Sequence, residues 1–324
     1  MKFESPLVLV SPPDRERWDA LVAGAPGASF FHTPAWAKLW TDEWPDSRWE
    51  ALVVEEGGAY AAGLGAIVRR RGPFRTIDAM PFATYGGPLV RKGHPDPRGL
   101  STALLEGFAR WIGGPFVLRA SLAWERGDRD AFPDRLPPLE SFTHVLPLSA
   151  DYEEVASHFS PSTRRLVRQA DESGLSIETA DTIEKIGAFY GLAVETVRRR
   201  GGTPKPRSLY ERIFHDLVSK GSGRYHLVRH GENVVAGSLH FFHEGVATNW
   251  LPVSSEAAWP LRPNNFLIAS ILETLSAAGY LEYNFGASPP DASGLIRYKE
   301  GWGARSRPVL LAGRRSGLHR RFRP

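Results

Sequence analysis

The chain has 324 residues, of which 42% are hydrophobic and 11% aromatic, so it can bury more than one core and we expect two domains. It contains no cysteine, which excludes disulfides, thiolate catalysis and cysteine-ligated metal sites. The net charge is only +4, but nine Lys and Arg residues stand against one acid from Arg297 to Pro324. We therefore expect this end of the chain to attract anions such as RNA, a nucleotide-linked substrate or an anionic membrane surface.

The first residues carry a short apolar run that Pro6 interrupts, which is unlike a signal peptide or a membrane span. We expect a soluble, cytoplasmic protein. A strand over residues 7–10 is followed by two helices, which start after Pro13 and at Pro34, where Thr33 is the expected N-cap. Apolar and alternating runs then predict an antiparallel meander in "RWEALVVEE", "AYAAGLGAIVRRR" and "FRTIDAM".

A helix over residues 97–112 and two strands, "PFVLRA" and "FTHVLPLS", complete the first half. The second half repeats this order. Four helices, the strand "LSIET" and the strands "RYHLVRH", "NVVAGSLHFF" and "GVATNWLPV" lead to a helix that ends at Gly279 and continues directly into the strand "YLEYNFG". We predict a mixed α+β fold formed by duplication, with domains over residues 1–148 and 149–313.

Residues 314–324 form a basic C-terminal tail, for which a solubilising role and a binding role fit equally well. The common catalytic motifs are missing: the chain has no phosphate loop, no dinucleotide fingerprint, no nucleophile elbow and no His-Glu-x-x-His sequence. His240 and His243 are three residues apart on a predicted strand and so face opposite sides. We therefore expect no metal site.

Several segments carry candidate binding residues. In "SPSTRRLVRQADESG", Arg164 and Arg168 share one face near a helix start, where the helix dipole opposes basic charge. A surface for phosphate or RNA explains this pair, and a solvated helix face explains it equally well. Lys205 lies in an extended loop between Pro204 and Pro206, which could close over a substrate, although a structural role is the simpler interpretation.

Two other segments combine aromatic or amide side chains with special backbone. Tyr85 precedes Gly86 and a second glycine, which allow a close backbone approach to a ligand but also form ordinary turns. Asn264 and Asn265 stand at a helix start, where we expect one to be the cap and the other to offer its amide beside a possible anion site. The stretch "GLIRYKEGWG" places one lysine among two aromatic residues and three glycines, and by itself predicts a glycine-rich turn.

Taken in chain order, eight segments resemble the Fem-type (FemABX) aminoacyltransferases, which are built from two tandem GNAT-like domains. They span nearly the whole chain: "SFFHTPAWAKLW", "ATYGGPL", "THVLPL", "STRRLVRQADESGL", "FYGLAVETVRRRGGTPKP", "NVVAGSLHFF", "YLEYNFGAS" and "GLIRYKEGWGA". The resemblance implies transfer of an amino acid from aminoacyl-tRNA, as co-substrate, to an amine of a peptidoglycan precursor or another nucleotide-linked or lipid-linked envelope acceptor. It implies no bound cofactor.

The resemblance also implies roles for single residues. Lys299 matches a family lysine near the acyl ester and the tRNA end, with Tyr298 in place of the usual phenylalanine. Lys38 resembles a lysine that contacts the phosphates of a nucleotide-linked acceptor, and Arg199 falls near a second phosphate contact. Where the family can place an aspartate, this chain has Ser121, so no carboxylate base is evident at that position.

An aminoacyl ester is already activated, so an amine attacks it without a covalent intermediate if the two are held together and the developing oxyanion is stabilised. A buried Lys299 would supply that stabilisation. One alternative is an acyl-CoA-dependent N-acyltransferase, although the glycine-rich phosphate loop expected at a helix start is replaced by "RPNNFL". Another is a non-catalytic module that binds RNA or an envelope precursor with the same fold.

Overall fold

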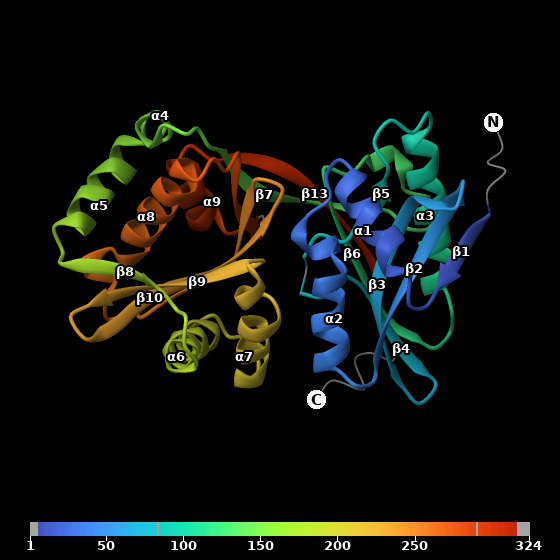
Figure 1. The fold of residues 1–324 in the computed structure, drawn as a ribbon, viewed down its shortest axis with the longest axis horizontal. Helices are drawn as coiled ribbons and strands as arrows, with labels where there is room; N and C mark the ends of the chain where they lie inside the picture. The colour runs from blue at the N-terminus through green and yellow to red at the C-terminus, as the bar shows by residue number, and fades with distance from the viewer. Residues whose placement is uncertain (1–5, 83, 290, 316–324) are drawn as a thin grey trace. The chain divides into compact units, whose positions relative to one another are not determined.

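The computed structural model describes residues 6–82, 84–289 and 291–315. The chain forms two compact units: the first takes in the described residues up to Ser141 and from Arg307 onward, and the second is Phe142–Ser306. Figure 1 shows the order of helices and strands along the chain. Within the described ranges, no helix is long and apolar enough to cross a membrane.

Unit 1 is a sheet with helices on both faces. Its strands are β1 (Leu7–Val10), β2 (Ser47–Glu56), β3 (Ala59–Arg71), β4 (Phe74–Ala79), β5 (Leu89–Val90), β6 (Val117–Glu125) and most of β13 (Arg305–Arg315), and its helices are α1 (Arg15–Gly24), α2 (Pro34–Glu43) and α3 (Pro97–Ile112). Short 3-10 turns lie at Phe30–His32 and Arg129–Ala131. The N-cap prediction for α2 is confirmed, because Thr33 Oγ1 accepts from the Trp36 amide at 3.3 Å and Pro34 takes the first turn.

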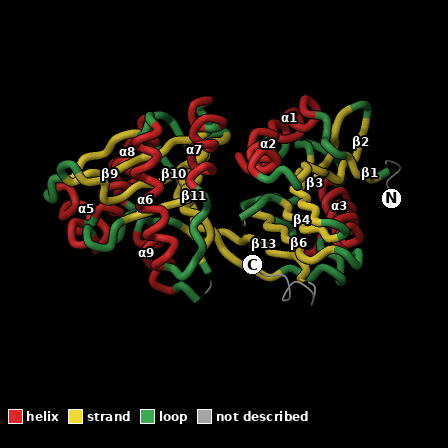
Figure 2. The backbone as a smooth tube through the Cα atoms, turned by 90° about the horizontal axis from the view of Figure 1, so that it is seen from below, coloured by secondary structure: helices red, strands yellow, loops and turns green. Residues whose placement is uncertain are grey.

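The strand order in unit 1 is β1-β2-β3-β4-β6-β13, with β5 paired to β3. The predicted meander is confirmed, since β2, β3 and β4 pair in antiparallel fashion, whereas β4 and β6 are parallel and α3 lies between them in the chain. One apolar core, around Leu104 and Phe108, joins α3 to one face of the sheet. A second core, around Trp18 and Leu21, joins α1 to β2 and β3 on the other face (Figure 2).

Unit 2 repeats this plan. Its strands are most of β7 (Leu139–Pro147), β8 (Leu175–Thr179), β9 (Gly223–His230), β10 (Asn233–His243), β11 (Val246–Ser254) and β12 (Glu282–Ser288). Its helices are α4 (Tyr152–Ser157), α5 (Pro161–Asp171), α6 (Ile183–Arg199), α7 (Arg207–Asp216), α8 (Pro263–Ala277) and α9 (Ser293–Gly301), with 3-10 turns at Val218–Lys220 and Trp259–Leu261.

The strand order in unit 2 is β7-β12-β11-β10-β9-β8. Strands β9, β10 and β11 form a second antiparallel meander, and β11 and β12 are parallel with α8 between them in the chain. In Figure 1, α5 and α8 lie on one side of this sheet and α6 and α7 on the other. In each unit a meander is followed along the chain by a helix and a parallel return strand, which confirms the predicted mixed α+β fold.

Two expectations for the C-terminal segment are wrong. The stretch "GLIRYKEGWG" is not a turn, because residues 293–301 form α9. The glycines of this stretch favoured a turn in the sequence, but tertiary packing stabilises a helix, since Trp302 at its end is completely buried. Arg314 and Arg315 do not belong to a separate tail, because they extend β13, whose residues Val309–Arg315 pair with β6. The rest of the predicted tail, residues 316–324, lies outside the described residues.

The glycines at the end of α9 allow close packing against the turn between α4 and α5. A Cβ at Gly301 would lie 2.7 Å from Thr163 Oγ1, and the Ser160 amide donates to the Gly301 carbonyl at 2.8 Å. Gly303 has a φ of 78°, and a Cβ there would lie 2.8 Å from the His158 Cβ. The structure therefore gives these two glycines a packing role.

We expect the substitution Gly303→Ala to lower the free energy of unfolding by about 2 kcal/mol, because a left-handed backbone and a steric clash act together. Gly294→Ala is the matched control. Gly294 lies on α9, and a Cβ at this position would have nothing within 4 Å, so alanine there should raise stability by about 0.5–1 kcal/mol. Urea unfolding of both variants checks this, and an equal effect of the two substitutions would contradict it.

Candidate functional site

The ammonium group of Lys299 is held at a bulge in β12. Lys299 lies in the last turn of α9 and is only 5% exposed. Its Nζ donates to the carbonyl oxygens of Gly286 at 2.6 Å and Ala287 at 3.2 Å. No ion pair to Lys299 occurs in the described part of the chain, and burial lowers its pKa to about 8.

The bulge has a local cause in the pairing of β12 with β7. The register shifts between Asn284, which pairs with Val145, and Ala287, which pairs with Thr143. Gly286 takes the extra position with a φ of 77°, and its amide donates to the Asn284 side-chain oxygen at 2.8 Å. Thr143 Oγ1 donates to the same oxygen at 2.7 Å. The two carbonyls that bind Lys299 are therefore fixed by the sheet itself.

A buried cation without a counterion is costly, and in proteins it commonly marks a functional site. An ammonium has three N–H donors, of which two are used by the carbonyls of Gly286 and Ala287. The third donor is available to an oxygen that develops negative charge. The arrangement can therefore stabilise an oxyanion beside the bulge, and it stays in place because the lysine is held by backbone atoms.

His144 lies on β7 between the two residues that pair with β12 on either side of the bulge. It is 1% exposed, and neither ring nitrogen has a hydrogen-bond partner among the described residues. Burial and then the charge of Lys299 lower the pKa of His144, so its imidazole is neutral at neutral pH. The sequence interpretation missed His144, because "THVLPL" reads as an ordinary strand.

A buried polar chain crosses the same sheet. Tyr283 Oη is 2.9 Å from His240 Nε2 and accepts from Asn249 Nδ2 at 3.0 Å, and the ring of His226 contacts that of His240 edge-on. Burial lowers the pKa of His226 to about 3 and that of His240 well below its ordinary value, so both rings are neutral. No group of three or more metal-ligating side chains is found among the residues described.

Three other predicted site residues, Tyr298, Arg164 and Arg168, lie on α9 and α5. The Tyr298 ring meets Trp302 edge-on at 6.3 Å, and burial raises the pKa of its hydroxyl. Arg164 is exposed and donates to the Ser157 carbonyl at 3.2 Å, and Arg168 is exposed on the same helix. The start of α5, the helix that carries both arginines, packs on the end of α9, the helix that carries Lys299.

A second group of predicted residues lies where β11 ends and α8 begins. The Arg199 guanidinium donates to the Ser254 carbonyl at 3.2 and 3.3 Å and lies 4.9 Å from the Trp259 ring. Lys205 Nζ lies 5.3 Å from the Trp250 ring, and burial lowers its pKa. These contacts hold both cations against aromatic rings of the same region.

The expected asparagine cap of α8 is wrong. The N-cap is Arg262, in the left-handed conformation with a φ of 56° and without a side-chain capping hydrogen bond. Pro263 takes the first turn, so the asparagines fall inside the helix. Asn265 is buried, and the Asn264 amide donates to Ser254 Oγ at 3.2 Å.

The predicted site residues of unit 1 have different surroundings. Lys38 is exposed, pairs with Asp42 at 2.6 Å and lines a pocket of about 490 Å³. Tyr85 is buried against Phe31, with ring centroids 6.0 Å apart. A Cβ at Gly86 would lie 2.0 Å from the Ala79 carbonyl oxygen, so this glycine is required by packing.

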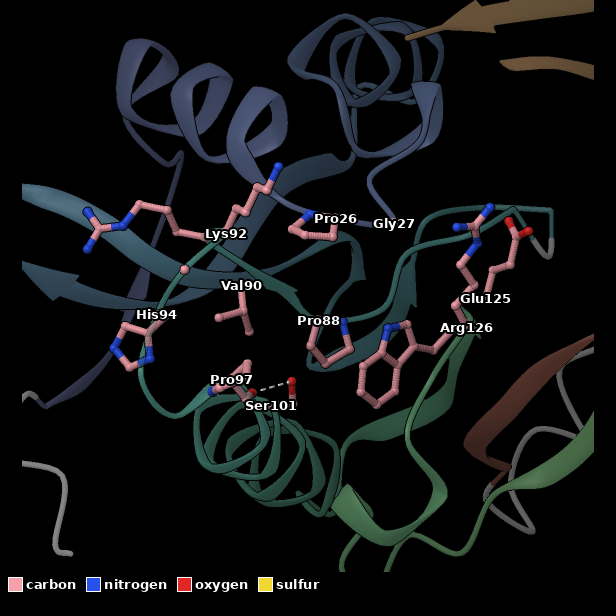
Figure 3. Close-up of a pocket in the computed structure, with 13 residues that line it drawn as sticks. Pro26, Gly27, Pro88, Val90, Lys92, His94, Pro97, Ser101, Glu125 and Arg126 are labelled. Atoms are coloured by element: carbon pink, nitrogen blue, oxygen red, sulfur yellow. Dashed lines mark hydrogen bonds between the residues drawn. The ribbon is translucent and has the colours of Figure 1, made fainter. Parts of the chain in front are cut away.

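A further pocket of about 380 Å³ lies beside the start of α3 (Figure 3). Basic side chains, among them Lys92 and Arg126, stand on its rim in this view, and Ser101 donates to the Pro97 carbonyl at its floor. None of the residues predicted for the site lines it.

Unit 1 supplies a carboxylate that the sequence interpretation missed. Asp78 on β4 pairs in register with Ser121 on β6, and Ser121 Oγ donates to Asp78 Oδ1 at 2.5 Å. The position at which no carboxylate was evident therefore receives one from the neighbouring strand. The available signal was an acid at the end of the apolar strand "FRTIDAM", but the sequence alone does not predict which strand pairs with it.

Comparisons with known proteins concern the fold. Residues 157–300 match the family model described as an acetyltransferase (GNAT) domain. The structure described as FemX is 14% identical, with a TM-score of 0.68 over 94% of this chain and 96% of that chain. A domain described as the C-terminal domain of a putative lysylphosphatidylglycerol synthetase from Agrobacterium fabrum is 15% identical, with a TM-score of 0.60 over 94% and 92%.

A tandem GNAT protein from the clavulanic acid biosynthesis pathway is 13% identical, with a TM-score of 0.55 over 95% of this chain and 98% of that chain. No curated protein matches the sequence. At these identities the solved structures establish the fold, and they confirm the predicted likeness to the Fem-type and tandem GNAT-like chains.

Proposed function

Since the chain is an acyltransferase with a GNAT domain and the fold of the Fem-type chains, we propose that it moves an aminoacyl group from aminoacyl-tRNA to an amine. The acceptor is a peptidoglycan precursor or another cell-envelope molecule, and the reaction takes place in the cytoplasm without a bound cofactor. The observation that carries the proposal is the buried ammonium of Lys299 at the β12 bulge, which forms no ion pair with any described residue.

The proposed chemistry follows from that ammonium. The acceptor nitrogen attacks the ester carbonyl carbon, and negative charge develops on the carbonyl oxygen. The third N–H of Lys299 donates to this oxygen in a site from which water is largely excluded, where such a hydrogen bond is strong. The new C–N bond then replaces the ester C–O bond, and the ribose oxygen leaves with the proton that the amine loses.

Support for the aminoacyl-tRNA donor comes from basic side chains and from the described relatives. Arg164 and Arg168 are exposed on the helix whose start packs on α9, which suits an RNA backbone. The FemX structure covers nearly all of this chain, and the second relative is described as a putative lysylphosphatidylglycerol synthetase. These observations favour the tRNA donor over coenzyme A.

The experiment mixes purified protein with charged tRNA and a peptidoglycan precursor or a small amine. We expect release of uncharged tRNA that depends on the amine and yields an amide stable to mild base. Release at the same rate without any amine would show simple hydrolysis and would contradict the proposal. A charge-reversal control, Arg168→Glu, should raise the KM for charged tRNA and leave the rate at saturation within about 3-fold.

We also expect Lys38→Ala and Arg199→Ala to raise the apparent KM for a phosphate-bearing acceptor more than they lower kcat, because phosphate contacts act in binding. Asp42→Ala is the control for Lys38, since it breaks the ion pair at 2.6 Å and leaves the lysine in place. Steady-state kinetics with varied acceptor checks this. An unchanged KM in both variants would remove these two residues from the site.

A second donor, acyl-CoA, is favoured by one observation, the match of residues 157–300 to an acetyltransferase domain. Against it stands the start of α8, where Arg262 takes the cap position and Pro263 removes one backbone N–H from the turn that would receive a pyrophosphate. Acylation supported by acetyl-CoA alone, with no effect of charged tRNA, would establish this second function in place of the first.

A further inference from the structure

A pocket on the sheet face opposite α3 lies wholly within unit 1. Its volume is about 730 Å³, and its floor is formed by β4, β6 and β13. Arg119, Ser121 and Ala123 alternate along β6 with Ala120 and Leu122, which also line the pocket and belong to the core under α3. The polar part of the floor therefore lies on the face of the sheet that the core under α3 does not use.

A buried ion pair forms the polar part of this floor. Asp78 is only 4% exposed, accepts from Ser121 Oγ at 2.5 Å, and its other oxygen accepts from Arg119 Nη2 at 2.5 Å. Burial raises the pKa of Asp78, and the charges of Arg119 and Arg69 with the Ser121 hydrogen bond lower it only in part. An additional cation at this carboxylate would offset the remaining desolvation cost.

Arg119 has donors to spare on the open side. A guanidinium carries five N–H donors in a fixed fork, and in the described contacts Arg119 gives one to Asp78. Its side chain is 38% exposed, in contrast to 6% for Asp78. The pair thus presents a negative group and a positive group side by side in one pocket, each able to bind a group of opposite charge.

The remaining wall combines apolar and aromatic side chains with three further arginines, Arg69, Arg314 and Arg315. Phe82 is 48% exposed and Leu139 is 74% exposed, and both line the pocket beside Trp44. Met80 and Phe82 both have positive φ angles, 64° and 63°, although neither is glycine. Strain of this kind persists where the surrounding structure requires it and concentrates at binding sites. It places an exposed aromatic ring at the rim of a charged pocket.

We propose that this pocket binds a free α-amino acid with a large apolar side chain. The ammonium of the ligand binds the Asp78 carboxylate, its carboxylate binds Arg119, and its side chain packs on Phe82, Leu139 and Trp44. Adjacent groups of opposite sign match the two ends of a zwitterion, whereas a simple anion or a simple amine would satisfy only one of them.

The pocket itself is independent of the reaction at Lys299. Binding is therefore measured without tRNA. Binding without transfer would contradict only the proposed function, and transfer to other amines without binding would contradict only this inference.

The experiment is calorimetric titration of the full chain with L-phenylalanine, N-acetyl-L-phenylalanine, L-phenylalaninamide, phenethylamine and 3-phenylpropionate. We expect L-phenylalanine to bind about 10- to 100-fold more tightly than each derivative that lacks one of the two charges. Absence of saturable binding of L-phenylalanine at about 10 mM would overturn the proposal, as would equal binding of phenylalanine and its N-acetyl form.

Two variants separate the two charges. Asp78→Asn should weaken the binding of L-phenylalanine about 10-fold or more, because the amide cannot replace the carboxylate as a partner for an ammonium. The affinity for 3-phenylpropionate should stay the same. Arg119→Gln should weaken the binding of L-phenylalanine and of 3-phenylpropionate but not the binding of phenethylamine. Asp130→Asn is the control, because it breaks an exposed pair with Arg98 at 2.7 Å outside the pocket. Equal losses for all ligands in both pocket variants would show a purely structural ion pair and contradict the proposal.

Discussion

Replacing Lys299 by methionine is expected to lower kcat by about 100- to 1,000-fold, the usual effect of removing one oxyanion donor. Methionine keeps the length and the apolar contacts of the side chain but has no N–H to donate. The KM for charged tRNA should change far less, because the lost interaction forms with the oxyanion and not with the ground-state ester. Single-turnover transfer from labelled aminoacyl-tRNA measures the chemical step directly.

Arg297→Met is the matched control, since Arg297 is an exposed basic residue on the same helix. It should leave kcat within about 2-fold. In a binding module Lys299 would contribute charge alone. Lys299→Met would then lower kcat by only about 2- to 3-fold, and a lower salt concentration would restore it. That result would contradict an oxyanion role for Lys299.

The free energy of unfolding should rise with pH because of Lys299. Its pKa is about 8 in the folded protein against 10.5 for the ordinary lysine of an unfolded chain. Between these values the unfolded chain holds a proton that the folded protein has released, so stability increases from pH 8 to pH 10.5. Below pH 8 the full cost of the buried charge is present. The lowering of the Lys299 pKa from 10.5 to about 8 corresponds to about 3 kcal/mol, since one pKa unit is worth about 1.4 kcal/mol.

The measurement is urea unfolding of the natural protein and Lys299→Met at pH 7 and pH 10. Other groups titrate in this range, among them Lys205, whose pKa burial also lowers, but they are common to both proteins. The difference in stability between the two proteins should therefore change by about 2 to 3 kcal/mol in favour of the natural protein as the pH rises. A constant difference would mean that Lys299 titrates normally and that its charge is not desolvated.

Local sequence signals predicted most of the elements. Thr33 before Pro34, and Gly279 after an apolar helix, mark boundaries through backbone chemistry that acts within a few residues. The same reasoning failed for α9, because its glycines predicted a turn, whereas tertiary packing of Trp302 stabilises a helix there. It also failed for β13, whose place in unit 1 depends on pairing with a strand nearly 200 positions earlier in the chain.

The candidate site shows the same limit. Lys299 was identified through a resemblance and not through its own pattern, because its two carbonyl partners exist only once β12 bulges against β7. His144 gave no signal, and the acid at the end of the strand that carries Asp78 was a weak one, since each residue belongs to a plain strand whose neighbour is far away in sequence. Gly86 was interpreted as a possible ligand contact, whereas the Ala79 carbonyl leaves no room for a side chain there.

One competition assay tests the central claim most directly. Purified protein receives an amine acceptor together with tritium-labelled aminoacyl-tRNA and carbon-14-labelled acetyl-CoA at equal concentrations, and the labels in the amide product are counted. Tritium in the product, lost in Lys299→Met and kept in Arg297→Met, is the result that the proposed function predicts. Carbon-14 in the product with no tritium, or tritium transfer that survives in Lys299→Met, would contradict it.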